Sequence, residues 1–167
     1  MRIVDAVMAI PGLLFALLII SALGSSAINA VIAIGITFAP GMARVSRSIT
    51  LTVREQDYVA AAVARGEGAA WIILREIAPN ILAPVIVEST IRVAFAIMLL
   101  ATLSFLGMGA QPPSPEWGLM ISDARAHLYR SPWPVIAPGV AIATVAVAFN
   151  LLGDGLRDVL NPRVQGG

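Results

Sequence analysis

The sequence contains no cysteine and no lysine, and its single histidine is His127. Without cysteine, the chain cannot form a disulfide framework, a thiol nucleophile or a cysteine-ligated metal site. One histidine also excludes a metal site built from a histidine cluster within the chain, so we expect His127 to be an exposed polar side chain rather than a ligand. The sequence has no GxxxxGK[ST] phosphate loop and no Gly-x-Ser-x-Gly elbow. It therefore predicts neither ATP binding by this chain nor an enzyme.

Charged residues are also scarce. They make up 13% of the 167 residues, whereas 58% are hydrophobic and the mean hydropathy is +0.86. A soluble domain of this length cannot bury so much apolar surface, and its charged fraction would be about a quarter. The net charge of +1, with no basic run, does not indicate a nucleic-acid partner. The composition predicts a membrane protein whose surroundings are the lipid bilayer.

Apolar segments of membrane-crossing length recur along the chain, since a helix needs about 20 residues to span a bilayer. We predict four spans, so the expected fold is an all-α, polytopic transmembrane helical bundle: residues 3–23, 30–49, 81–108 and 133–152. Pro11-Gly12 should kink the first span. A cleaved signal peptide is the alternative for that span, but Asp5 and the Pro-Gly interruption disfavour it.

Arginine is concentrated between the second and third spans, which predicts that this connection is cytoplasmic. Arg157 and Arg163 follow the last span and place the C-terminus on the same side, and four spans then put both termini in the cytoplasm. Residues 110–132 would form the opposite, extracytoplasmic loop. The arginines of the cytoplasmic connection are Arg44, Arg47, Arg54, Arg65 and Arg75.

Two charged residues, Glu88 and Arg92, fall inside the third span. They are four residues apart on one helical face and are predicted to pair. The pair would lie either at the interfacial entrance of the helix or along a pathway in the bundle interior.

The connection between the second and third spans has its own helical pattern. Asp57 can cap a helix that begins at Tyr58, and Gly66 or Gly68 can end that helix in a left-handed conformation. A second helix over residues 69–77 would be stopped by Pro79, giving a helical elbow. Alanines at 60–62 and 64 make the first helix thin enough for close contact with a partner. An amphipathic loop lying on the membrane surface is the alternative.

Several motifs in this chain resemble one transporter family. Tyr-Val-x-Ala-Ala-x-x-x-Gly at 58–66, followed by Ile77-x-Pro79-Asn80, resembles the signature loop of ABC importer permeases. The resemblance is closest to the dipeptide/oligopeptide/nickel branch and extends over essentially the whole chain. The motifs similar to that branch are MRIVDAVMAIP at 1–11, LSFLGMGAQPPSPEWGLMI at 103–121 and FNLLGDGLRDVLNPR at 149–163.

The resemblance implies a permease subunit of the plasma (inner) membrane of a bacterium or archaeon. It would translocate peptides or a related small solute with two cytoplasmic ATPase subunits, a homologous second permease and an extracytoplasmic solute-binding protein. ATP would be bound by the ATPases, and this chain would hold no cofactor or metal. The coupling helix that the resemblance implies would contact the ATPase through Asp57, Tyr58, Ala61, Ala62, Arg65, Gly66 and Glu67. The implied elbow would be fixed by Ile77 and Pro79. The candidate contact with the binding protein consists of Gln111, Pro112, Pro113 and Trp117.

The sequence departs from the family pattern in three places. Ala60 replaces a glutamate of the signature, and Leu100 occupies the position of an acid in the third span. Members of the branch usually have six spans, so residues 1–167 are expected to be a single transmembrane domain forming the C-terminal portion of such a permease, with a coupling loop at about residues 50–80. A stand-alone small channel or an inactive permease fragment is the alternative. If the chain is such a permease subunit, Gly66→Asp is predicted to uncouple ATP hydrolysis from transport.

Overall fold

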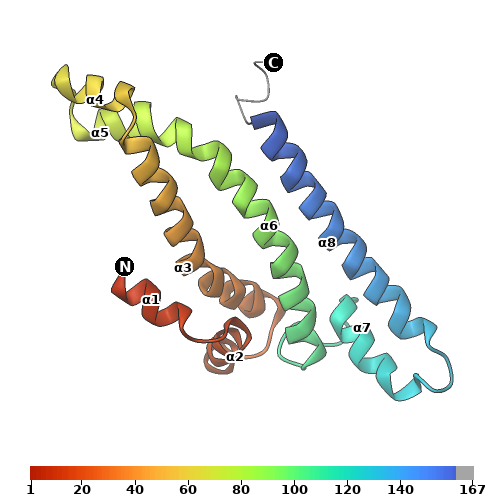
Figure 1. Cartoon of the computed structure of the whole chain (residues 1–167). Coiled ribbons are helices and arrows are strands. Elements are labelled where there is room, and N and C mark those ends of the chain that lie inside the picture. The colour runs from red at the N-terminus through yellow and green to blue at the C-terminus, as the bar shows by residue number, and fades with distance from the viewer. Residues whose placement is uncertain (161–167) are drawn as a thin grey trace.

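The computed structural model describes residues 1–160, and that part of the chain contains helices and no strand (Figure 1). The predicted all-helical class is confirmed. Arg163 and the end of the motif at 149–163 lie outside the described residues. The helices are α1 (Arg2–Met8), α2 (Gly12–Leu23), α3 (Ala27–Arg54), α4 (Asp57–Ala64), α5 (Ala69–Trp71), the π-helix η1 (Ile72–Ile77), α6 (Ala78–Phe105), α7 (Trp117–Ala124), the 3₁₀ turn η2 (Arg125–His127) and α8 (Trp133–Leu160).

Three of these helices are long and apolar enough to cross a membrane: α3, the continuous helix Ala69–Phe105, and α8. The predicted first span is instead two helices, α1 and α2, bent by 94° relative to each other. Pro11 lies at the break in extended conformation (φ −54°, ψ 129°) and precedes the first residue of α2. Because proline lacks an amide hydrogen, it is better placed there than inside a helix. The described bundle therefore has three spans, or four if the bent pair counts as one.

The bent pair nevertheless packs onto α3. Asp5 of α1 forms an ion pair with Arg44 of α3, and α2 contributes to the buried core. That core consists mostly of small or β-branched side chains, which let helices in a membrane approach closely. Its fully or nearly fully buried members are Ala16, Ile20, Ala30, Ala33, Ile34 and Leu103.

Helix α6 is the central element, lying between α3 and α8, with α7 packed against the ends of α6 and α8 (Figure 1). Glycines make these contacts close. A Cβ built at Gly118 of α7 would lie 2.1 Å from the carbonyl oxygen of Ala101, and one at Gly153 of α8 would lie 2.5 Å from Thr90 Oγ1. Only glycine fits at such distances without displacing the neighbouring helix.

The outer faces of the bundle are apolar. Large hydrophobic side chains such as Leu18 of α2, Phe95 of α6 and Leu151 of α8 are exposed. A helix with apolar side chains on both its packed and its outer face is typical of a membrane span. The fold therefore agrees with the polytopic membrane class predicted from composition.

Candidate functional site

Helices α4 and α5 form an elbow at one end of the molecule, at the same end as the C-terminal end of α8 and opposite α7 (Figure 1). α3 ends at Arg54, and α4 begins at Asp57 after Gln56, whose extended backbone (φ −75°, ψ 146°) makes it the N-cap without a side-chain hydrogen bond. The prediction that Asp57 caps this helix was wrong by one position. Asp57 lies instead in the first turn, where its negative charge interacts favourably with the helix dipole.

The other end of α4 is closed by glycine, as predicted. Gly66 has a φ of +78°, the left-handed conformation that glycine adopts without strain. The amide of Gly66 donates to the Val63 carbonyl at 3.0 Å, and the amide of Glu67 donates to the Ala62 carbonyl at 3.2 Å. These two bonds form a Schellman motif, which turns the chain back towards the bundle. Gly68 is not left-handed and serves as the N-cap of α5.

The second arm of the elbow runs without interruption into the membrane-length helix. α5, η1 and α6 form one helix from Ala69 to Phe105, so the predicted stop at Pro79 is wrong. In a regular α-helix the ring of Pro79 would clash with the carbonyl of Arg75. The π-helical turn Ile72–Ile77 widens the backbone just before the proline, an adjustment that lets helices accommodate proline. Ile77 and Pro79 therefore lie within a continuous helix, and the reversal itself lies at residues 65–68.

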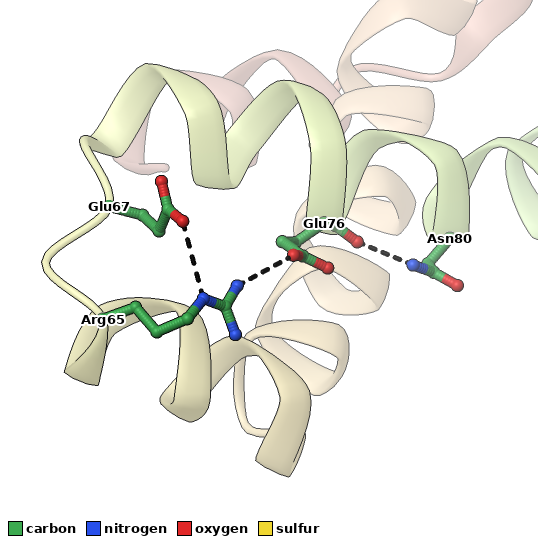
Figure 2. Close-up of polar contacts among 4 residues, drawn as sticks. All are labelled: Arg65, Glu67, Glu76 and Asn80. Atoms are coloured by element: carbon green, nitrogen blue, oxygen red, sulfur yellow. Dashed lines mark hydrogen bonds and ion pairs between the residues drawn. The ribbon is translucent and has the colours of Figure 1, made fainter.

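Arg65 forms two ion pairs at the elbow, one within the turn and one with the second arm (Figure 2). Arg65 Nε lies 3.5 Å from Glu67 Oε1, and Arg65 Nη2 lies 3.6 Å from Glu76 Oε1. The side-chain amide of Asn80 donates to the backbone carbonyl of Glu76 at 2.6 Å. Glu76 thus contributes its carboxylate to the elbow while its carbonyl is held by the next helical turn. The sequence analysis did not identify Glu76 as a site residue.

The predicted contact residues of α4 differ in how exposed they are. Asp57, Tyr58, Ala61, Arg65 and Gly66 are exposed and Glu67 is half-buried. The remaining candidate, Ala62, has no exposed surface, and Val59 of the same helix is also buried. Ala62 therefore packs α4 against the rest of the chain and has no surface for a partner in this arrangement.

Exposed apolar side chains flank the elbow on both arms. Val63 of α4, Trp71 of α5 and Leu74 of η1 are exposed, in addition to Tyr58. Exposed apolar side chains gathered at a polar end of a protein are typical of an interaction surface. Val63, Trp71 and Leu74 were not predicted as contact residues from the sequence, where Trp71 and Leu74 fall outside the matched motif at 58–66. Their signal was present as large apolar residues within a region that was predicted to be cytoplasmic.

The candidate residues for a binding-protein contact lie at the opposite end, between α6 and α7. Pro112, Pro113 and Trp117 are exposed, and Trp117 begins α7 after the N-cap Glu116, whose carboxylate accepts from the Leu119 amide at 3.0 Å. Gln111 is also exposed, but its side-chain amide donates to the carbonyls of Gly107 and Gly109 at 3.0 and 3.2 Å. The side-chain amide of Gln111 therefore stabilises the loop, and its hydrogen-bond donors are already used within the chain.

A third cluster lies within the spans. Glu88 and Arg92 form the predicted pair, with Arg92 Nη2 2.9 Å from Glu88 Oε1, and both are part-buried near the middle of α6. Arg92 lies over Gly41 of α3, where a Cβ would come within 2.8 Å of Nη1, and its Nε is buried without a hydrogen-bond partner. Arg92 also lines a cavity of about 250 Å³ with Gly12, Thr37 and Phe38.

Within residues 1–160, no group of three histidine, cysteine, aspartate or glutamate side chains could hold a metal ion. His127 is exposed at the end of the short 3₁₀ turn Arg125–His127.

Membrane-length helices, a buried core of small side chains and an exposed helical elbow at one end define an integral membrane protein of the polytopic helical class. The chain belongs to the family described as "Binding-protein-dependent transport system inner membrane component", whose model matches residues 1–166. Members of this family are transport components rather than enzymes.

Named relatives agree with that membership. The chain is 45% identical over 164 residues to the dipeptide transport system permease protein DppC of Alkalihalophilus pseudofirmus, covering 98% of this chain and 54% of the relative. It is 43% identical over 166 residues to the glutathione transport system permease protein GsiD of Escherichia coli and of Shigella flexneri, covering 99% of this chain and 55% of each relative. The chain spans about half the length of the curated relatives that it matches.

Proposed function

We propose that this chain is part of the transmembrane subunit of an ATP-binding-cassette importer and that its α4–α5 elbow contacts a cytoplasmic ATPase. The observation that supports this most directly is the elbow itself, a short helix closed by a Schellman turn and held at one end of the spans. The proposed contact surface consists of exposed residues only: Asp57, Tyr58, Ala61 and Gly66, extended by Val63, Trp71 and Leu74.

The proposed mechanism places ATP on two separate ATPase subunits and no cofactor on this chain. Closure of the ATPases would move α4 as a rigid element, and the spans would alternate between inward-facing and outward-facing arrangements. A homologous second permease would complete the translocation pathway. An extracytoplasmic solute-binding protein would deliver the solute to the α6–α7 end, where Pro112, Pro113 and Trp117 are exposed.

We propose a short peptide or a related small solute as the cargo. The names of two relatives specify a dipeptide and glutathione, both of which are small molecules with amide bonds and free carboxylates. Such a solute could meet the Glu88–Arg92 pair in α6, beside the cavity that Arg92 lines.

The proposed orientation follows from the arginine distribution. Arg54, Arg65 and Arg75 lie on or beside the elbow, and Arg157 lies near the end of α8 at the same end of the molecule (Figure 1). By the positive-inside rule, this end is cytoplasmic and the α7 end is extracytoplasmic.

A substitution pair at Gly66 tests the coupling role. A β-branched residue is strained in the left-handed region, by about 1–2 kcal/mol or more, whereas asparagine tolerates it. No atom lies within 4 Å of a Cβ built at Gly66, so space inside the chain is not limiting. We expect Gly66→Val in the assembled transporter to reduce solute-stimulated ATP hydrolysis and uptake about tenfold, the effect of roughly 1.4 kcal/mol, whereas Gly66→Asn retains most of both.

Membrane insertion and expression should be unchanged in both variants. Gly66→Asp, which shares the local hydrogen-bonding ability of asparagine but adds charge, should have an uptake between those of the other two variants and, as predicted from the sequence, retain more ATP hydrolysis than uptake. Wild-type uptake by Gly66→Val, at wild-type expression, would contradict the coupling role of this turn.

A further inference from the structure

We infer that Arg65 acts within the permease, as a strap that fixes the coupling helix α4 to α6 through Glu76, and that motion of α4 therefore enters the bundle through α6. This inference rests on the proposed function, because it specifies how the elbow transmits movement. It also reassigns two residues that the family resemblance placed in the ATPase contact, Arg65 and Glu67.

The direction of the Arg65 side chain is the first observation. Its guanidinium lies between the carboxylates of Glu67 and Glu76, with two different nitrogens facing the two acids (Figure 2). Glu67 belongs to the turn, whereas Glu76 belongs to η1, at the beginning of the continuous helix that becomes α6. One side chain therefore links the end of α4, the turn and the second arm.

The Arg65 strap adds to the packing that already holds the buried side of α4. Val59 and Ala62 are buried, and α4 packs against η1 more extensively than against α3. Between α3 and α4 lie only Glu55 and Gln56, both exposed. The stiffer of the two attachments of α4 is thus its attachment to the α6 side.

The backbone of Glu76 is fixed as well. Its carbonyl accepts from the side chain of Asn80 at 2.6 Å, one helical turn further along the chain and within α6. A displacement of the Glu76 carboxylate therefore acts on a helical segment rather than on a loose side chain. From there α6 contacts α3, α7 and α8, which makes it the element best placed to move the whole bundle. It also contains the Glu88–Arg92 pair.

Each ion pair alone is a modest interaction, since exposed pairs contribute about 0.2–1 kcal/mol. Arg65 is half exposed, whereas Glu76 is largely covered. The strap should therefore reduce opening of the turn severalfold rather than determine whether α4 folds. That expectation makes the inference measurable without unfolding the protein.

The test is to swap the charges of Arg65 and Glu76 between the two arms. In the assembled transporter in lipid nanodiscs, amide hydrogen exchange of residues 57–68 is measured together with solute-stimulated ATP hydrolysis, for Arg65→Glu, Glu76→Arg and the double variant. Glu76→Arg should exchange roughly two- to fivefold faster at the amides of Gly66 and Glu67, the factor expected from losing one partly exposed pair. Arg65→Glu loses both pairs and should exchange at least as fast. The double variant restores an Arg–Glu pair with the two residues interchanged. It should return both the amide exchange rates and the solute-stimulated ATP hydrolysis towards the wild-type values.

Arg75→Glu is the matched control. It reverses a charge beside Glu76, but Arg75 forms no ion pair within residues 1–160. It should leave exchange of residues 57–68 at the wild-type rate.

The possible outcomes separate the strap from a direct contact. If Arg65 touches the ATPase, the double variant stays as defective as Arg65→Glu in ATP hydrolysis, and the inference is overturned. Unchanged exchange in both single variants would overturn it equally. If instead the wild-type permease associates with no ATPase, the proposed function fails, and the same exchange measurement on the permease alone in nanodiscs still tests the strap.

Discussion

At the residue scale, Arg92 is a charged residue that the neighbouring helices hold closely. It lies near the middle of α6, contacts Glu88 and is packed over Gly41 of α3. A charge in a membrane span is costly unless it is paired, and it commonly marks a pathway for solutes or ions. The cavity that Arg92 lines agrees with the pathway alternative for the pair.

A double-mutant cycle measures this pair. Glu88→Gln leaves Arg92 without its carboxylate, and Arg92→Met leaves Glu88 unpaired. Each should lower stability by about 1–2 kcal/mol, less than a fully buried pair because both side chains keep part of their surface exposed. The double variant should be nearly as stable as wild type. The measurement is thermal unfolding of the purified complex followed by tryptophan fluorescence.

The cycle also has a transport readout. If the pair lines the pathway, the double variant regains stability but its uptake still differs from that of the wild type. Equal stability of all four proteins would mean that Glu88 and Arg92 do not interact in the membrane.

At the scale of elements, the elbow shows which features of a fold are local. The glycine stop at Gly66 could be predicted because a left-handed C-terminal turn depends on a few consecutive residues. The Glu88–Arg92 pair could be predicted for the same reason, since residues four apart on a helix always share a face. Asp57 was misplaced by one position, which is the usual uncertainty of helix boundaries.

Features that depend on the three-dimensional arrangement were not accessible from the sequence. Proline normally stops a helix, and the π-turn that accommodates Pro79 has no recognisable sequence pattern. The Arg65–Glu76 pair depends on the chain reversal at residues 65–68, which brings together residues from different helices. The burial of Ala62 likewise follows from how α4 packs against the second arm, because the neighbouring alanines have the same side chain.

Glycines in α7 and α8 provide a prediction about helix packing. A Cβ at Gly118 would meet the backbone of Ala101, whereas one at Gly155 of α8 would have no neighbour within 4 Å among residues 1–160 beyond its own helical turn. Gly118→Ala should therefore destabilise the α6–α7 contact by about 1–3 kcal/mol. Gly155→Ala should instead stabilise its helix by about 0.5–1 kcal/mol, because it removes backbone freedom from the unfolded state.

Thermal unfolding of the two variants, in the same complex and detergent, checks that Gly118→Ala lowers the melting temperature and that Gly155→Ala raises it. Similar shifts of the two melting temperatures in the same direction would mean that α7 does not pack on α6 as closely as the structure shows.

At the scale of the whole molecule, the arrangement has two distinct ends. The elbow and the end of α8 lie at one end, and α7 with the proline-rich loop lies at the other (Figure 1). Between them, the helices expose apolar side chains to their surroundings. Family membership shows a transport component, and the two distinct ends agree with the proposal that different partners bind there.

The most direct test of that arrangement uses the absence of cysteine from the sequence, since an introduced cysteine is then the only thiol of these 167 residues. Tyr58→Cys places it on the exposed side of α4, and Ser114→Cys places it in the exposed loop before α7. In the assembled transporter, Tyr58→Cys should cross-link to an ATPase subunit and react with a membrane-impermeant thiol reagent only from the cytoplasmic side. Ser114→Cys should react only from the opposite side and form no such cross-link. Labelling of Tyr58→Cys from outside, or no cross-link in a complex that contains the ATPase, would contradict the coupling role of the elbow.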